Sequence, residues 1–210
     1  QVAAVTRLAV ERDLVLIPFG GGTSISRSLQ PRPEETRTVV SVDLGRMNRV
    51  LEIDETSGLA TIQAGVLGPD MEEQLNARGW TLGHFPDSFT HSTVGGWAAT
   101  RSSGMQSDKY GDIADIVRGL RMVRPSGTVV LRSLPSTSTG PSLREMIIGS
   151  EGRLGIITDA RYRFERGVDP AFALAGTLVG KQLLYVEKYM KLLARRWKAM
   201  SDKEIYGYMA

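Results

Sequence analysis

The chain of 210 residues contains no cysteine and only two histidines, His84 and His91. The absence of cysteine excludes disulfides, thiolate zinc sites, iron–sulfur clusters and cysteine nucleophiles. Two histidines are too few for a multi-histidine metal centre, so we expect no metal site. No apolar run reaches the ~18 residues of a membrane-spanning helix. The first residues mix acidic and basic side chains without an apolar core, so we also expect no signal peptide.

Lysine is nearly absent from the first part of the chain. Residues 1–170 carry 18 Arg and 1 Lys against 20 Asp and Glu, whereas residues 171–210 carry 2 Arg and 5 Lys against 3 acidic residues. The formal net charge of +3 therefore comes from the C-terminal segment. Because the main body is neutral and has no basic stripe interleaved with aromatics, we expect no nucleic-acid partner. The change in composition predicts a domain over 1–167 and a helical tail over 168–210.

Helices and strands alternate irregularly along the domain, with several strands adjacent in sequence, which favours an α+β fold. The pattern predicts helices over 2–9, 69–75 and 142–148, and strands over 14–17, 38–42, 50–53, 60–64, 116–123, 128–131 and 155–164. The continuous apolar run Leu14–Ile17 is typical of a strand buried on both faces. Residues 81–112 are rich in small side chains and weakly periodic, and a structureless stretch of this length is usually functional.

Four clusters of glycine and hydroxyl residues lie at the ends of predicted strands or helices: Gly20–Ser24, Asp87–Gly96, Thr100–Gly104 and Gly149–Gly155. In the first cluster three glycines follow a strand, so that backbone N–H groups can converge on an anion such as phosphate. A structural turn would also explain this loop, which matches neither the P-loop nor the dinucleotide fingerprint. Four such clusters in one small domain indicate a large ligand with a pyrophosphate.

The segments PFGGGTS, PDSFTHSTVGGWAATRSSGM, YGDI and GSEGRLGIIT stand in the order and at the intervals found in flavoproteins of the vanillyl-alcohol-oxidase, or PCMH-type FAD-binding, superfamily. Within it, the sequence resembles the alkyldihydroxyacetonephosphate synthase (alkylglycerone-phosphate synthase) family in ETRTVVSVDLGRMNRVLEID, Gly83–Ser88, STVGGW and Ser138–Pro141. The resemblance covers residues 1–166. It implies two α+β subdomains with FAD between them, and a first strand that has no counterpart here.

The resemblance also implies which residues bind FAD, and it implies that they do so without a covalent bond. The first cluster would cradle the pyrophosphate with backbone amides, and the second would line the ribityl chain and isoalloxazine, with Thr93 nearest the ring. The third would continue that wall, and the fourth would contact the adenosine side. Arg153 stands where the family usually has Thr, and it either reaches a phosphate or points to solvent. The implied cofactor-binding residues are Pro18, Phe19, Gly20, Gly21, Gly22, Thr23, Ser24, Asp87, Ser88, Phe89, Thr90, His91, Ser92, Thr93, Thr100, Arg101, Ser102, Ser103, Glu151, Gly152, Arg153, Leu154, Gly155, Ile156 and Ile157.

The activity implied by the resemblance is the exchange of the acyl chain of acyl-dihydroxyacetone phosphate for a fatty alcohol, which forms the ether bond of ether lipids without net redox. The family's catalytic acid/base and substrate-phosphate residues have no recognisable counterpart here, so the catalytic residues are unknown. Two alternatives remain: an FAD-linked oxidase or dehydrogenase of a 2-hydroxy acid such as D-lactate or glycolate, and a catalytically incomplete FAD-binding fragment. The resemblance further implies a homodimer that is peroxisomal or glycosomal in a eukaryote and cytoplasmic in a bacterium.

Several polar and aromatic side chains have a structural interpretation that we favour over a catalytic one. His84 lacks a paired nucleophile or metal partner, so we expect a hydrogen-bonded loop residue rather than a base. Asp112 and Asp115 are expected to cap the turn before a strand. Trp80 and Trp97 are expected in the core or the wall of a pocket.

The tail carries an apolar stripe at helical spacing, formed by Val186, Met190, Leu193, Trp197 and Met200, with basic residues outside it. A basic amphipathic helix of this kind can lie on an anionic membrane surface. Packing against its own protein is the commoner explanation of such a stripe.

Overall fold

The computed structural model describes residues 1–134 and 137–166, which belong to the first of the chain's two units, Gln1–Gly167. The predicted tail over 168–210 and its apolar stripe lie outside the described residues. Within the described ranges, no helix combines the length and the apolar character that crossing a membrane requires. The same ranges contain no group of three or more His, Asp or Glu side chains placed to hold a metal ion.

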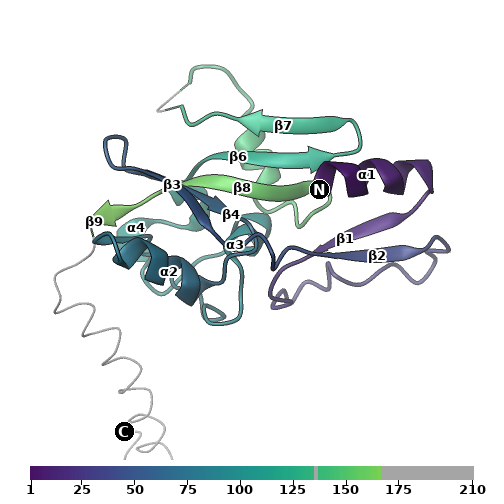
Figure 1. Cartoon of the computed structure of the whole chain (residues 1–210), viewed down its shortest axis with the longest axis horizontal. Helices are drawn as coiled ribbons and strands as arrows, with labels where there is room; N and C mark the ends of the chain where they lie inside the picture. The colour runs from purple at the N-terminus through teal and green to yellow at the C-terminus, as the bar shows by residue number, and fades with distance from the viewer. Residues whose placement is uncertain (135–136, 167–210) are drawn as a thin grey trace, which may run out of the picture. The chain divides into compact units, whose positions relative to one another are not determined.

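A small parallel sheet opens the fold. Helix α1 (Val2–Glu11) is followed by β1 (Val15–Phe19), which pairs in parallel with β2 (Val39–Asp43), and the three elements lie together in Figure 1. The prediction that β1 is buried on both faces is wrong, because its residues are only half-buried and Phe19 is exposed. Among the described residues β1 has one paired strand and one covering helix, so its apolar side chains stay partly open to water.

A larger antiparallel sheet of five strands carries the core. In order across the sheet the strands are β3 (Val50–Asp54), β4 (Leu59–Gln63), β8 (Ile156–Arg163), β6 (Val117–Arg124) and β7 (Gly127–Leu131). The predicted hairpin is confirmed as β6 and β7, joined at a tight turn. The sheet is mixed with helices rather than wound in regular βα units, which confirms the predicted α+β class.

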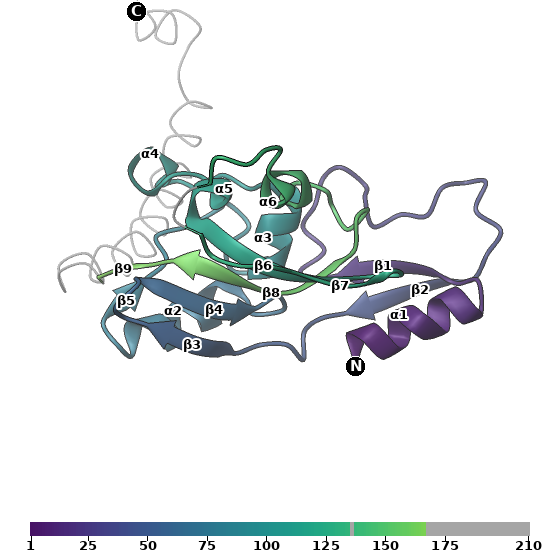
Figure 2. The ribbon, with the colours of Figure 1, turned by 90° about the horizontal axis from the view of Figure 1, so that it is seen from above.

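Helices α3 (Val94–Thr100), α5 (Ile113–Ile116) and α6 (Leu143–Ile147) lie on one side of this sheet (Figure 2). Tyr162 on β8 is fully buried and donates its hydroxyl to the Val94 carbonyl at 3.1 Å, which joins α3 to the sheet. Four more elements complete the unit. They are α2 (Gly68–Asn76), with Pro69 in its first turn, α4 (Ser107–Tyr110), and the strands β5 (Trp80–Thr81) and β9 (Glu165–Arg166), which form a short antiparallel pair.

Residues 81–112, which lack a periodic pattern, nevertheless contain α3 and α4. The sequence pattern of α3 is obscured because Gly95 and Gly96 have weak helix propensity and because its seven residues are too few to show a repeated apolar stripe. The helix is fixed instead by Thr93, whose side chain accepts a hydrogen bond from the Gly96 N–H, and by tight packing. A Cβ at Gly95 would overlap with Ala64, so only glycine lets α3 approach the end of β4 this closely.

The aspartates before β6 behave as predicted. The Asp112 side chain accepts from the backbone of α5, and Asp115 Oδ2 accepts from the Asp112 N–H at 3.0 Å. This reciprocal pair is a capping box, which starts α5 and thereby sets the entry into β6.

Candidate functional site

A cleft of about 430 Å³ lies between the glycine loop that follows β1 and the α3 side of the larger sheet. Its volume falls in the range of small-molecule and cofactor pockets, roughly 300–1,000 Å³. All four glycine and hydroxyl clusters contribute to its walls. From the predicted set, the lining includes Pro18, Phe19, Gly20, Gly21, Gly22, Thr23, Ser24, Ser88, Ser92, Thr93, Thr100, Ser102, Glu151, Gly152, Gly155 and Ile157.

The first glycine loop lines this cleft, and its backbone donors are unpaired within the described residues. None of the five amide N–H groups of Gly20–Ser24 donates a hydrogen bond within the described residues. Gly22 has a φ of +68°, a conformation that side chains with a Cβ rarely adopt. Successive free amides in a turn of this kind form a concavity that binds anions, so the loop fits a pyrophosphate.

Glycine in this loop is also required by the opposite wall. A Cβ on Gly21 would overlap with the backbone carbonyl of His91, and a Cβ on Gly20 would overlap with Thr93 Oγ1. The loop after β1 therefore packs directly against the backbone of the segment that caps α3. This contact brings the first and second clusters together although they lie far apart in the sequence.

The second wall is organised around Trp97, which is almost fully buried and lines the cleft. Its indole Nε1 donates to Ser92 Oγ at 2.6 Å, and its ring stacks on Phe89. The prediction of a core or pocket-wall residue is confirmed for both tryptophans, since Trp97 lines the cleft and Trp80 packs against the buried Phe164 of the core. Four predicted residues of this cluster do not line the cleft: Asp87, Phe89, Thr90 and His91.

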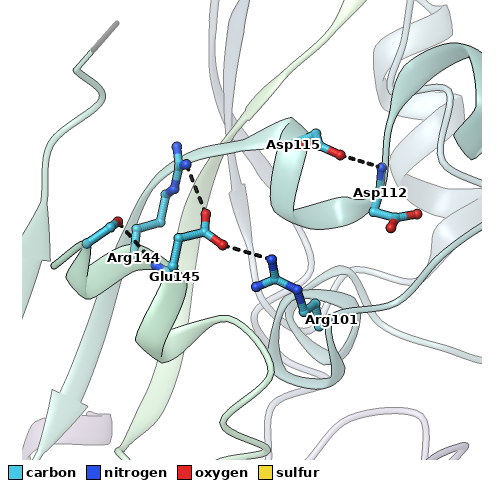
Figure 3. Close-up of polar contacts among 6 residues, drawn as sticks. Arg101, Asp112, Asp115, Arg144 and Glu145 are labelled. Carbon is cyan, nitrogen blue, oxygen red and sulfur yellow. Dashed lines mark hydrogen bonds and ion pairs between the residues drawn. The ribbon is translucent and has the colours of Figure 1, made fainter. Parts of the chain in front are cut away.

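The third cluster lines the cleft with Thr100 and Ser102 but not with Arg101. Figure 3 shows the Arg101 side chain directed at Glu145 of α6, with a nitrogen–oxygen distance of 2.9 Å. Arg144 reaches the other carboxylate oxygen of Glu145 at 3.0 Å. Burial would raise the pKa of Glu145, but the hydrogen bonds from the two guanidinium groups outweigh it and hold that pKa below its usual value. Arg101 thus ties the end of α3 to α6.

In the fourth cluster Glu151 is the one charged side chain among the described lining residues. Gly152 packs against the Pro18 ring, where an added Cβ would lie 2.7 Å from Cγ, so this loop closes over β1. Arg153 is exposed and does not line the cleft. The remaining predicted residues outside the lining are Ser103, Leu154 and Ile156.

Sequence reasoning missed part of the lining. The additional residues are Ile25, Ser26, Ser28, Leu29, Leu44, Gly95, Gly96 and Ala99. Gly95 and Gly96 belong to the second glycine and hydroxyl cluster, so the sequence pattern could have identified them as lining residues. Residues 25–29 lie in an irregular loop and Leu44 follows β2, and only the folded chain brings them to the cleft.

His84 is the hydrogen-bonded loop residue that the sequence predicts. It is 1% exposed, and its Nε2 lies 2.8 Å from Ser102 Oγ. Burial lowers the pKa of His84 to about 4, against an opposing effect of the negative charge of Asp112. At this pKa the imidazole is too weakly basic to take up a proton at neutral pH, which fits a structural role better than that of a general base.

Comparison with known proteins agrees with this site. Residues 1–132 match the FAD binding domain family. The alkyldihydroxyacetonephosphate synthase of Trypanosoma brucei brucei is 47% identical over 163 residues, covering 77% of this chain and 26% of that protein. A solved structure of an alkyldihydroxyacetonephosphate synthase superposes with a TM-score of 0.74 at 47% identity, covering 79% of this chain and 30% of its own. A D-lactate dehydrogenase of Anaerostipes hadrus is 35% identical over 161 residues, covering 76% of this chain and 33% of that protein.

The chain therefore belongs to the FAD binding domain family, the PCMH-type flavoproteins, and its cofactor is FAD. Within that family it is similar to the alkyldihydroxyacetonephosphate synthases. The free amides of Gly20–Ser24 and the hydroxyl-rich opposite wall fit the pyrophosphate and polar chain of this cofactor. The chain spans 26% of the length of the synthase it matches, so that relative has large regions without a counterpart here.

Proposed function

We propose that the chain forms the FAD-binding part of an alkyldihydroxyacetonephosphate synthase, which exchanges the acyl chain of acyl-dihydroxyacetone phosphate for a fatty alcohol in ether lipid biosynthesis. The observation that carries the proposal is the 47% identity with the Trypanosoma synthase over three quarters of the chain. The D-lactate dehydrogenase matches a stretch of similar length, 161 residues, at 35%. Both relatives match about three quarters of this chain, so the difference in identity favours the synthase.

In this proposal the chain's own residues bind and enclose the cofactor. The amides of Gly20–Ser24 donate to the pyrophosphate, and the hydroxyls of Ser88 and Thr93 face the cofactor from the α3 side. Trp97 closes the wall behind them and excludes water, since it is nearly fully buried. FAD, when bound, supplies an isoalloxazine ring that can accept and return an electron pair.

Substrate recognition requires groups that the described residues do not bring to the cleft. A substrate phosphate calls for cationic side chains, whereas the only charged side chain in the described lining is the carboxylate of Glu151. Proton transfer requires an acid or base with a pKa near the working pH, whereas burial lowers the pKa of His84 to about 4. We therefore assign phosphate binding and proton transfer to parts of the protein outside the described residues.

The test compares two substrates on the flavin-loaded protein under anaerobic conditions. Acid precipitation first establishes how FAD is held: flavin released into the supernatant indicates a non-covalent complex. We then expect acyl-dihydroxyacetone phosphate, and not D-lactate, to change the flavin absorbance. Bleaching by D-lactate alone would replace the proposal with a 2-hydroxy acid dehydrogenase. A loaded protein that responds to neither would be a catalytically incomplete FAD-binding fragment.

A further inference from the structure

One imidazole nitrogen of His84 has no hydrogen-bond partner. Its Nε2 lies 2.8 Å from Ser102 Oγ, whereas Nδ1 is buried and unpaired within the described residues. Ser102 lines the cleft, and its hydroxyl has no other partner in the described part of the chain. A buried histidine thus stands directly behind a hydroxyl that faces the cofactor site.

The surrounding segment holds the imidazole in place. Glu72 on α2 accepts from Thr81 Oγ1 at 2.8 Å and from the Leu82 N–H at 2.9 Å, which fixes the backbone just before His84. Gly83 has a φ of +72° and sits against the Tyr110 ring, where a Cβ would lie 2.8 Å from Cδ2. The ring of His84 meets Trp97 edge-on at a centroid distance of 5.2 Å. Rotation of the imidazole toward a different partner is therefore restricted.

This geometry distinguishes the two neutral tautomers of His84. A proton on Nδ1 would leave a buried donor unpaired, at the full cost of its desolvation. A proton on Nε2 finds an acceptor in Ser102 Oγ and leaves only a lone pair unpaired, which proteins tolerate more readily than an orphaned N–H. In the Nε2–H tautomer Ser102 accepts from His84, so the hydroxyl proton of Ser102 is free to donate elsewhere.

We propose that His84, as the Nε2–H tautomer, holds the Ser102 hydroxyl as a hydrogen-bond donor directed into the cleft, where it binds an oxygen or nitrogen acceptor of FAD. His84 is a positioning residue that acts through Ser102. In the Nδ1–H tautomer, the Ser102 hydroxyl would instead donate to His84 Nε2, and Ser102 would offer the cofactor only an acceptor. The inference rests on the cleft being the FAD site, but the tautomer itself can be measured without any cofactor.

The first experiment determines the tautomer by nitrogen-15 NMR of the histidine-labelled chain without FAD. The sequence makes this assignment simple because it contains only His84 and His91, and His91→Asn identifies the remaining set of signals. We expect the protonated nitrogen of His84 to be Nε2 at neutral pH. Protonation of Nδ1 would overturn the proposal whatever the protein does with FAD.

The second experiment measures the FAD dissociation constants of Ser102→Ala, His84→Phe and the double variant by flavin fluorescence. One lost hydrogen bond should weaken binding by about threefold to tenfold in each single variant. Because His84 acts through Ser102, the double variant should bind no more weakly than Ser102→Ala alone, and Ser102→Thr should restore affinity. Effects that multiply in the double variant would overturn the proposal.

Two further comparisons keep this result interpretable. Ser126→Ala, in the turn between β6 and β7, removes a hydroxyl remote from the cleft lining and should bind FAD as the unmodified chain does. If His84→Phe does not fold, the tautomer and the contrast between Ser102→Ala and Ser102→Thr still decide the question. Failure of the unmodified chain to bind FAD would contradict the cofactor site and the donor role of Ser102, while the tautomer measurement would stand separately.

Discussion

The two sides of the cleft differ in what their backbone amides do. On the β1 side the amides of Gly20–Ser24 donate to nothing within the described residues. On the opposite side the His91 N–H donates to the Ser88 carbonyl at 2.9 Å, and the Glu151 N–H donates to the Ala99 carbonyl at 2.8 Å. The first side thus leaves its amides free for an anion, whereas the second uses its amides to hold its own shape and offers side-chain hydroxyls.

The same two sides differ in packing. The strand residues of β1 are half-buried, whereas Ile62 on β4 and Tyr162 on β8 are fully buried. The β1 side therefore has little core of its own, and a cofactor bound there would supply part of its stabilisation through mass action. The larger sheet has a core that stabilises it without a ligand. The candidate anion-binding loop and the most buried core thus lie in different parts of one unit.

Truncation of core side chains should show the largest difference between the two sides. Ile62→Ala removes a fully buried side chain and should lower the free energy of unfolding by about 3–4 kcal/mol. Ile17→Ala on β1 removes a half-buried side chain and should cost about 1 kcal/mol. Urea unfolding without FAD measures both. Equal losses would mean that the two sheets share one core and that the contrast in packing has no energetic consequence.

A branched side chain in the glycine loop should abolish cofactor binding with less effect on the larger sheet. Gly21→Val places its Cβ on the His91 carbonyl and displaces the loop from the opposite wall. Loss of two charge-assisted hydrogen bonds to the pyrophosphate would weaken FAD binding by about 100-fold or more. The measurement is flavin retained after gel filtration, with Thr128→Val on exposed β7 as the control for adding a valine. Full flavin occupancy in Gly21→Val would contradict the assignment of this loop.

Local patterns in the sequence were sufficient for most elements of the fold. Apolar runs and turn residues located α1, α2, α6 and all five strands of the larger sheet, because these elements follow their intrinsic periodicity. The pattern failed to predict α3, because the position of this helix depends on Gly95 packing closely against Ala64. It also failed for the burial of β1, because an apolar run does not reveal how many neighbours will cover it.

The cleft could be predicted in outline for a similar reason. Glycine and hydroxyl clusters mark places where backbone and small donors meet a ligand, and residues from all four clusters line it. Leu44 and Leu29 have no such signal and reach the cleft only through the tertiary fold. Arg101 illustrates the opposite case. It stands between the lining residues Thr100 and Ser102 in the sequence, but its side chain pairs with Glu145 and does not line the cleft.

The buried histidine on the well-packed side should make the stability of the protein depend on pH. The pKa of His84 falls from 6.5 to about 4 on folding, so the folded state binds fewer protons than the unfolded chain between these values. Its contribution to stability is therefore complete above pH 6.5 and is lost as the pH falls toward 4. With about 1.4 kcal/mol per pH unit, the loss by pH 5 is about 2 kcal/mol.

The experiment compares unfolding free energies of the unmodified chain and His84→Phe as the pH falls from neutrality to 5. The carboxylates titrate in both proteins, so the difference between the two curves isolates the histidine. We expect His84→Phe to gain stability relative to the unmodified chain at the lower pH. Parallel curves would mean that His84 titrates alike in the folded and unfolded states, in conflict with its burial beside Trp97.

The smallest effect is expected where the cleft wall meets the surface. Arg101→Ala removes a half-exposed ion pair with Glu145, leaves that carboxylate paired with Arg144, and should cost less than about 1 kcal/mol of stability. Alanine at this position has the same steric cost as arginine at a φ of +54°, so the backbone contribution is unchanged. FAD affinity should change by less than about twofold, because the Arg101 side chain does not line the cleft. A tenfold loss of affinity in a fluorescence titration would instead place this guanidinium on the cofactor and add a cationic side chain to the wall formed by the hydroxyls.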